Sequence, residues 1–417
     1  MAPAPVCALD GGVVDDFERM WSDLAPVGRS ASSGGYFRQP FRTAERELAA
    51  WFTEQAAARG LRLESDPTGN VVAWWDAGSG PGVLTGSHLD SVPDGGWLDG
   101  ALGVLAGLGC LRAWASHGER PPRDLILCDW SDEEGSRFGH SLLGSSAAVG
   151  TLDADAAEAL TDAGGTTLGE ALRDNGLDPA RLGDAAGALP GLAAYLELHI
   201  EQGPVLESEG LAVAAVRGTA GVERFGLRIT GRGSHAGTTP MDQRRDAGLA
   251  AAETALEAER AAIDAGGVAT AGRLDLSPGA TTIVPGEAEL LLDLRNPREG
   301  ALGAMLDRVT EFAGAAAARR GCSVAIEPIW RIEPIGFDPG LVAIVSEEVA
   351  SRAGRTEPLT SGALHDAANL ARRVPVAMVF ASSTAGLSHN AAEDTPEADL
   401  RLAIEAFGAG VNRVLAG

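Results

Sequence analysis

The residues most suited to chemistry begin in the stretch GVLTGSHLDSVPDGGWLDGALG, residues 82–103, which carries His88, Asp90 and Asp99. The apolar run before His88 predicts a buried strand, and the small apolar residues after Asp99 predict a helix. His88 and Asp90 are two residues apart, so in an extended segment both side chains point to the same side. An imidazole beside a carboxylate suits a metal ligand whose ring is oriented by the acid. Taken alone, however, this triplet is more typical of a polar surface loop.

Two later blocks repeat the pattern of an apolar run followed by polar side chains. DLILCDWSDEEGSRFG presents Glu133 and Glu134, and YLELHIEQGPVLE presents His199 and Gln202. Continuous apolar runs are typical of central parallel strands, and open α/β sheets carry their chemistry at the carboxyl ends of such strands. We therefore expect these side chains to converge on one edge of a sheet.

Together the blocks predict a centre for divalent metal ions, with His88, Asp99, Glu134, His199 and His389 as the candidate ligands. Mixed imidazole and carboxylate ligands suit zinc, and also manganese, cobalt or nickel. A carboxylate such as Asp99 can bridge two ions, and paired ions can activate water and polarise a carbonyl group. A turn could aim one of the adjacent Glu133 and Glu134 at an ion and the other at the water, as a general base. A solvated surface is the usual explanation of an isolated Glu-Glu pair.

Composition narrows the class of protein. The chain has 417 residues, 45% hydrophobic content and a formal net charge of −25, which argues against nucleic acid and anionic membranes as partners. No secretory signal and no membrane-length apolar run are visible. The four cysteines, Cys7, Cys110, Cys128 and Cys322, show no C-x-x-C spacing and indicate reduced thiols in the cytoplasm.

The order of expected elements predicts two domains. Residues 217–330 have a strand-helix-strand-strand-helix-strand order, in which ATTIVPGEAELLLDLRNP is expected to form a hairpin, and this order is typical of an α+β domain. We therefore expect an α/β catalytic domain formed by residues 1–216 and 331–417, with a smaller α+β domain inserted between them.

Six blocks in this order resemble a known family: GSHLDSVPDGGWLDGALGV, DEEGSRFG, ELHIEQGPVLE, GSHAGTTPM, SGALHDA and GLSHNAAE. They are similar to the di-metal amidohydrolases of the aminoacylase/carboxypeptidase clan. HIEQGPVLE and HAGTTPM mark the branch of N-carbamoyl-L-amino acid hydrolases, beta-ureidopropionases and allantoate amidohydrolases. The resemblance implies a mixed-sheet metallohydrolase domain with an inserted dimerisation, or lid, domain.

The resemblance also assigns roles. It implies that the five candidate ligands hold two ions with Asp99 as the bridge, that Glu133 is the general base, and that Asp90 supports His88. His235 matches a residue that reaches into the partner's active site and stabilises an oxyanion, which implies a homodimer joined through the inserted domains. Gln202 and Arg295 match substrate-binding positions, and Arg295 would pair with an α-carboxylate. Without the resemblance, a surface ion pair would be the simpler explanation of Arg295.

Two positions depart from the family pattern and concern the substrate. Thr282 stands where the family commonly has Asn, and it offers one short hydroxyl in place of an amide donor and acceptor. Leu364 stands where Gly is usual, which would fill space near the substrate. The segments GGYFRQPF and NVVAWW are more similar to allantoate amidohydrolases than to the broad carbamoylases.

The sequence thus predicts a cytoplasmic, homodimeric hydrolase that cleaves the C–N bond of an N-carbamoyl-L-amino acid or allantoate and releases ammonia and carbon dioxide. One alternative keeps the mechanism but cleaves an N-acyl amino acid, a dipeptide or another amide. A second alternative is a non-catalytic relative that binds a small carboxylate or a partner protein. The intact ligand positions and Glu133 oppose it, because a binding protein has no need of a general base.

Overall fold

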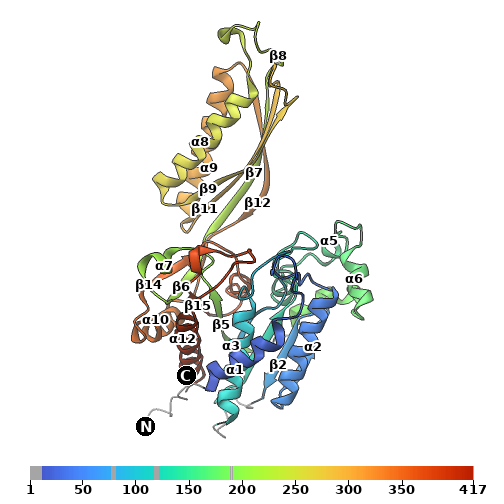
Figure 1. Cartoon of the computed structure of the whole chain (residues 1–417), viewed down its shortest axis with the longest axis vertical. Helices are drawn as coiled ribbons and strands as arrows, with labels where there is room; N and C mark the ends of the chain where they lie inside the picture. Colours follow the sequence, from blue (N-terminus) through green and yellow to red (C-terminus); the bar gives the residue numbers. More distant parts are fainter. Residues whose placement is uncertain (1–11, 77–80, 117–121, 188, 190, 417) are drawn as a thin grey trace. The chain divides into compact units, whose positions relative to one another are not determined.

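The chain divides into two compact units. The computed structural model describes residues 12–76, 81–116, 122–187, 189 and 191–416 (Figure 1). One unit comprises residues up to Arg217 together with Phe337–Gly417, and the other comprises Gly218–Gly336. The second unit extends past residue 330, where the sequence placed its end, because its last long strand continues to Ile332.

A mixed nine-stranded sheet forms the centre of the first unit. Its order is β1-β2-β4-β3-β5-β15-β6-β13, with β14 paired to β6. The four central strands, β4, β3, β5 and β15, run parallel. Strand β2 pairs antiparallel with β4, and β6 pairs antiparallel with β15. The bounds are β1 Arg62–Ser65, β2 Val71–Trp75, β3 Gly82–His88, β4 Leu125–Trp130, β5 Leu192–Ile200, β6 Val213–Thr219, β13 Ile335–Gly336, β14 Arg355–Ser361 and β15 Val376–Ala381.

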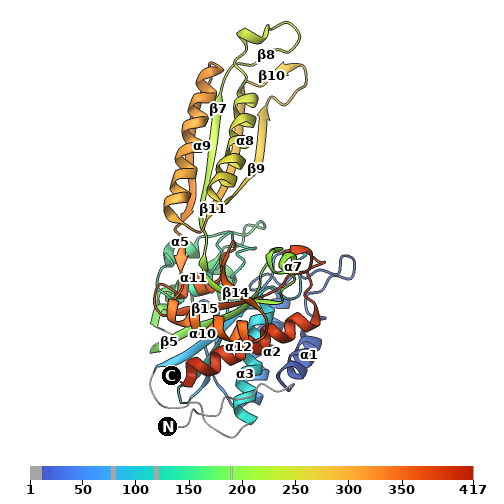
Figure 2. The same ribbon diagram turned by 90° about the vertical axis from the view of Figure 1, so that its left-hand side faces the viewer.

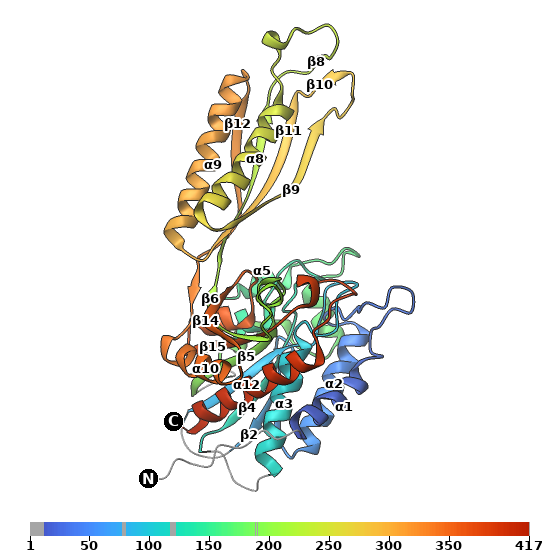
Figure 3. The same ribbon diagram turned by 60° about the vertical axis from the view of Figure 1, so that its left-hand side comes forward.

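Helices cover this sheet because its central strands are apolar on both faces. Every residue of β3, β4 and β15 is buried. Helix α3 (Ala101–Ser116) packs against β3, β4 and β5, and α12 (Glu397–Ala416) packs against β15 and β5 (Figure 3). The other helical segments are α1 Gly12–Leu24, α2 Thr43–Ala58, α4 Leu143–Ala148, α5 Ala154–Glu158, α6 Leu168–Asp174, η1 Pro179–Gly187, α7 Val205–Glu209, α10 Pro339–Ser351, α11 Asp366–Leu370 and η3 Thr384–Gly386.

The second unit is a four-stranded antiparallel sheet with two helices on one face (Figure 2). Its order is β12-β7-β11-β9, with β7 Gly221–Thr230, β9 Val268–Ser277, β11 Glu287–Asn296 and β12 Ser323–Ile332. Alternate residues of β11 are buried, and they form a core with helices α8 (Ala247–Ala265) and α9 (Glu299–Arg319). Asp246 accepts a hydrogen bond from the Leu249 amide at the start of α8, and Gly266 ends it with φ 65°.

The expected hairpin in this unit is wrong in its pairing. Strand β11 pairs along its length with β9, a strand that the sequence analysis did not predict. The short strand β10 (Ile283–Val284) pairs instead with β8 (Ser234–His235), and η2 (Met241–Gln243) follows in the chain. The reason is that β9 and β11 share a long antiparallel ladder, which leaves the IVPG segment in the connection between these two strands.

Two further findings concern membrane-spanning helices and the state of the cysteines. No helix among the described residues is both long enough and apolar enough to cross a bilayer. Cys110, Cys128 and Cys322 are free thiols, whereas Cys7 lies outside the described residues.

Candidate metal centre

The candidate ligands come from the carboxyl ends of parallel strands and from the loops beside them. His88 ends β3 and His199 lies near the end of β5. Glu134 follows β4, Asp99 precedes α3, and His389 follows η3. The structure brings all five together as two groups that share Asp99.

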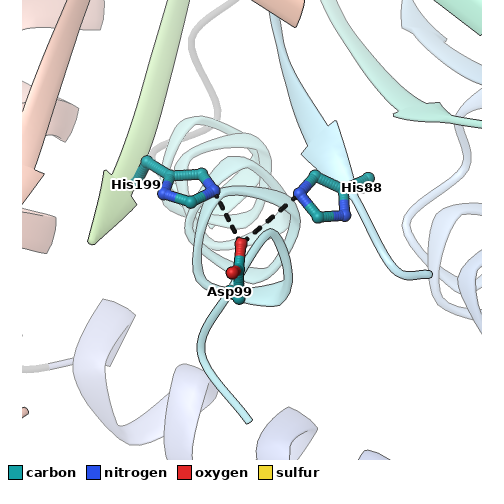
Figure 4. A group of neighbouring side chains, drawn as sticks. All are labelled: His88, Asp99 and His199. Atoms are coloured by element: carbon teal, nitrogen blue, oxygen red, sulfur yellow. Dashed lines mark ion pairs between the residues drawn. The ribbon is translucent and has the colours of Figure 1, made fainter. Parts of the chain in front are cut away.

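The first group consists of His88, Asp99 and His199, all buried (Figure 4). Asp99 Oδ1 lies 3.7 Å from His88 Nε2 and 3.1 Å from His199 Nε2. The other ring nitrogens face carbonyl oxygens, His88 Nδ1 at 3.1 Å from that of Asp90 and His199 Nδ1 at 3.0 Å from that of Ile200. A carbonyl only accepts, so each neutral ring carries its proton on Nδ1 and directs the Nε2 lone pair towards Asp99.

The second group consists of Asp99, Glu134 and His389. His389 Nε2 lies 3.3 Å from Asp99 Oδ2 and 3.3 Å from Glu134 Oε2. Glu134 Oε1 is buried and has no hydrogen-bond partner among the described residues. His389 has a φ of 55°, a left-handed backbone that non-glycine residues adopt rarely and often at functional sites.

The geometry of both groups fits divalent cations. Two ligands held about 2.0–2.1 Å from one tetrahedral ion lie about 3.3 Å apart. The ligand atoms of each group lie within 4.8 Å of one another, so an ion requires only small adjustments. Among the described residues Glu134 Oε1 has no hydrogen-bond partner, and His199 Nε2 accepts one long bond of 3.3 Å from the Gly100 amide. These electron pairs are therefore suited to a cation.

The carboxylate of Asp90 supports both the first group and the neighbouring glutamates. Its Oδ1 lies 3.4 Å from His88 Nδ1 and accepts a hydrogen bond of 3.2 Å from the Glu133 amide. Its Oδ2 accepts one of 3.3 Å from the Glu134 amide. The expected link from Asp90 to His88 is therefore present, and the same carboxylate orients the turn that carries both glutamates.

Glu133 lies beside the ligands and does not belong to either group. Its Oε2 is 3.7 Å from His88 Nε2. Burial raises the pKa of Glu133 well above its usual range, although the charge of His88 opposes the shift. Burial also raises the pKa of Glu134 to about 7, with the nearby Asp99 adding to the effect. A hydrogen bond to Asp99 raises the pKa of His389 to about 9.

The expected substrate-binding residues are divided between the two units. In the first unit, Gln202 donates from Nε2 to Asp99 Oδ2 at 2.9 Å, and Leu364 is half-buried directly before His365. His235, Thr282 and Arg295 belong to the second unit. There the Thr282 carbonyl accepts a hydrogen bond from Ala236, next to His235.

The sequence analysis missed two residues that contact the ligand loops, Ser388 and Glu393. Ser388 Oγ donates to Asp99 Oδ2 at 2.8 Å, and the buried Glu393 accepts hydrogen bonds from the Asp99 segment. Both lie in the block GLSHNAAE that identified His389, which was the available signal.

Comparisons with known proteins show which family the chain resembles. The model of peptidase family M20/M25/M40 matches residues 84–413. The N-carbamoyl-L-amino acid amidohydrolase of Geobacillus stearothermophilus is 37% identical over 399 residues, covering 93% of this chain and 96% of that protein. The allantoate amidohydrolase of Bacillus subtilis is 29% identical over 390 residues, covering 92% and 93%. A crystal structure of a hydantoinase/carbamoylase family amidase from Burkholderia ambifaria has a TM-score of 0.86 at 36% identity, covering 96% of this chain and 97% of that one.

Because the two groups share Asp99, we predict different metal contents for two variants. Asp99→Asn removes the shared charge, so we expect it to lose both ions. His389→Ala spares the strand-borne His88 and His199, so we expect it to retain one ion. Elemental analysis after loading with Zn²⁺ or Mn²⁺ measures both, with His140→Ala as a control outside the groups. Equal metal content in the two ligand variants would contradict a shared carboxylate.

Proposed function

The chain belongs to peptidase family M20/M25/M40 as an amidohydrolase, and we propose that it cleaves the C–N bond of a linear ureido group. The substrate is an N-carbamoyl-L-amino acid or allantoate, and the products include ammonia and carbon dioxide. The observation that carries the proposal is the pair of ligand groups joined by Asp99, with Glu133 beside them. The similarity to an N-carbamoyl-L-amino acid amidohydrolase over almost the whole chain supports the ureido class.

In this proposal His88, Asp99 and His199 hold one divalent ion, and Asp99, Glu134 and His389 hold the other. Bound ions supply Lewis acidity, which polarises a carbonyl group and makes water a stronger acid. Zinc, manganese, cobalt and nickel all suit these donors. Glu133 takes a proton from the attacking water and delivers it to the leaving nitrogen, a role that its position beside the candidate ligands supports.

His235 suits the role of a hydrogen-bond donor to the developing oxyanion. The amides of Gly237 and Thr238 donate to His235 Nδ1 at 3.0 and 3.2 Å. Since Nδ1 accepts these bonds, the neutral ring carries its proton on Nε2, which lies on the outer edge of an exposed side chain. Arg244 stabilises the turn by donating to the carbonyls of Ala236 and Thr239.

The positions of His235 and Arg295 support a homodimer. Glu287 pairs with Thr230 at one end of the sheet, and Arg295 pairs with Val222 at the other. Eight residue steps of a strand span about 27 Å, and His235 lies beyond the Thr230 end. One small substrate cannot touch both residues of the same chain. If Arg295 binds its carboxylate and His235 its oxyanion, they come from different subunits.

The second unit offers a surface for this association, the α8–β9 surface, formed by Leu249, Leu256, Ile263, Leu274 and Leu276. The three residues of α8 are spaced seven apart and are 41%, 53% and 70% exposed, so they form one apolar stripe. Strand β9 is the edge of its sheet and presents unpaired backbone groups. An apolar stripe beside a free edge suits the same surface of a second copy.

Arg295 supports the proposed carboxylate site in chemistry and exposure. Its side chain is 31% exposed, and its Nε and one Nη donate to the two oxygens of Asp293 at 2.8 and 3.4 Å, so a substrate carboxylate would have to share or replace this ion pair. A guanidinium can pair with a substrate carboxylate through two parallel bonds. Thr282 beside His235, and Leu364 beside the first unit's site, are the positions where we expect the identity of the ureido acid to be decided.

We place the enzyme in the cytoplasm, which the three free cysteines support. A net charge of −25 supports a small-molecule substrate and opposes nucleic acid and anionic membranes as partners. These assignments rest on composition, and fractionation of cells tests the location directly.

The proposed function is tested by ammonia release from apoprotein reconstituted with Mn²⁺, Zn²⁺, Co²⁺ or Ni²⁺. The panel contains allantoate, several N-carbamoyl-L-amino acids and their D-enantiomers, with N-acetyl amino acids and dipeptides assayed for free amine. We expect turnover of one ureido class and preference for the L-enantiomer. Turnover of only the N-acetyl or dipeptide compounds would replace the ureido substrate by another amide.

We predict that Glu133→Gln keeps both ions and loses turnover. The side chain is not among the ligand atoms, whereas removal of a general base lowers kcat by about 10²–10⁴-fold. Elemental analysis and kcat on the best substrate measure the two effects. Glu170→Gln, at an exposed helix start, is the matched control and should retain full activity. Turnover comparable to wild type would remove Glu133 from the mechanism.

We predict that His235→Ala and Glu133→Gln complement each other in a heterodimer. One of its two sites combines an intact Glu133 with the intact partner His235, so a purified heterodimer should show about half of the wild-type activity. The double variant paired with either single variant is the control and should stay inactive. Failure of the heterodimer to regain activity, although it forms, would contradict a site shared between subunits.

A further inference from the structure

We propose that Glu393 is a positioning residue that joins the loop carrying Asp99 to the loop carrying His389, and thereby sets the affinity for the second metal ion. This inference rests on the metal centre proposed above. Glu393 is 2% exposed and lies outside both ligand groups. A buried carboxylate needs partners, and those of Glu393 are all found on the two ligand loops.

One oxygen of Glu393 holds the Asp99 loop by its backbone. Oε1 accepts hydrogen bonds from the amides of Leu98 at 2.9 Å and Asp99 at 3.0 Å. Two bonds to consecutive amides fix the backbone direction at the residue whose carboxylate is shared by both groups. The position of Asp99 therefore depends on Glu393.

The other oxygen of Glu393 contacts the His389 loop at Ser388, whose one hydroxyl proton can be donated either to Glu393 or to Asp99. Oε2 lies 3.0 Å from Ser388 Oγ, which also lies 2.8 Å from Asp99 Oδ2. Ser388 directly precedes His389, and residues 389–392 are all exposed. Because these four residues are exposed, packing does little to fix the segment between Ser388 and the buried Glu393. Loss of Glu393 would therefore increase the conformational entropy of this segment, and ion binding would have to overcome that entropy.

The glycine at position 96 is required by the same contact. A Cβ built on Gly96 would lie 2.2 Å from Glu393 Cδ and Oε1, closer than any packed atoms. Only glycine lets the carboxylate reach the Leu98 and Asp99 amides. A substitution of Gly96, on the loop that carries Asp99, is therefore a second way to displace the Glu393 side chain.

The two ions should depend on Glu393 to different extents. The first group takes His88 and His199 from buried central strands, which hold their positions without Glu393. The second group takes Asp99 and His389 from the two loops that Glu393 joins. Loss of a residue that orients ligands commonly weakens metal affinity by about 10–100-fold. We expect this effect on the second ion and a smaller effect on the first.

The test is a calorimetric titration of apoprotein with Zn²⁺ and with Mn²⁺, resolving two binding steps. We expect Glu393→Ala, Gly96→Ala and Ser388→Ala each to raise the second dissociation constant, by about 10–100-fold for Glu393→Ala. Glu393→Gln should restore most of the affinity, because its amide oxygen still accepts from both backbone amides. Asp338→Ala is the control: it removes the cap of α10, so it should lower Tm and leave both dissociation constants unchanged.

The outcomes separate this inference from the metal centre itself. If Glu393→Ala and Ser388→Ala lower Tm but keep both dissociation constants within about twofold of wild type, Glu393 is only structural and the proposal is overturned. If Glu393→Ala fails to fold, Ser388→Ala and Gly96→Ala decide in the same way. A wild-type protein that binds no ion would instead remove the metal centre on which the proposal rests.

Discussion

The site depends on one buried carboxylate that stays ionised among other acids. Burial opposes the charge on Asp99, yet the neighbouring imidazole groups of His199 and His389 hold its pKa well below the usual range. Around the same point, burial raises the pKa of Glu133 and Glu134. Three carboxyl groups this close together cannot all be ionised without cations nearby. Their different environments therefore give Asp99 a lowered pKa and the two glutamates raised pKa values. Divalent ions would relieve this repulsion, which supports the proposed metal centre with Glu133 beside it.

The loops that carry the candidate ligands are held in place by buried carboxylates that accept hydrogen bonds from backbone amides. Asp90 accepts from the amides of Glu133 and Glu134, and Glu393 accepts from those of Leu98 and Asp99. Each buried carboxylate thus fixes two consecutive amides in a loop that carries a ligand. Loops are the most mobile parts of a fold, whereas the strands that carry His88 and His199 are held by pairing on both sides. Asp90 and Glu393 thus fix the loop backbones by hydrogen bonds, as strand pairing fixes the strands of the sheet.

The residues proposed to act in the reaction lie in both units. The first carries the candidate ligands and Glu133 at strand ends and in adjacent loops, where α/β sheets usually place their sites. The second carries Arg295 near one end of β11 in its sheet and His235 beyond the other end. Its helices cover one face of that sheet and leave β9 as a free edge. The length of β7 and β11 separates His235 from Arg295, and the strand order leaves β9 as the edge proposed for a second copy.

The sequence by itself determined the family, the α/β class, the apolar central strands and the residue types of the site. These follow from local patterns: apolar runs, turn residues and blocks such as HIEQGPVLE, which are legible in a few consecutive positions. Only the tertiary structure decided which oxygen of Asp99 faces which group, which strand pairs with β11, and that Glu393 holds the Asp99 amide. Glu393 and Asp99 are 294 residues apart, and the sequence analysis did not predict β9, the strand that pairs with β11. Such contacts depend on the balance of burial and pairing over the whole chain, which no local pattern contains.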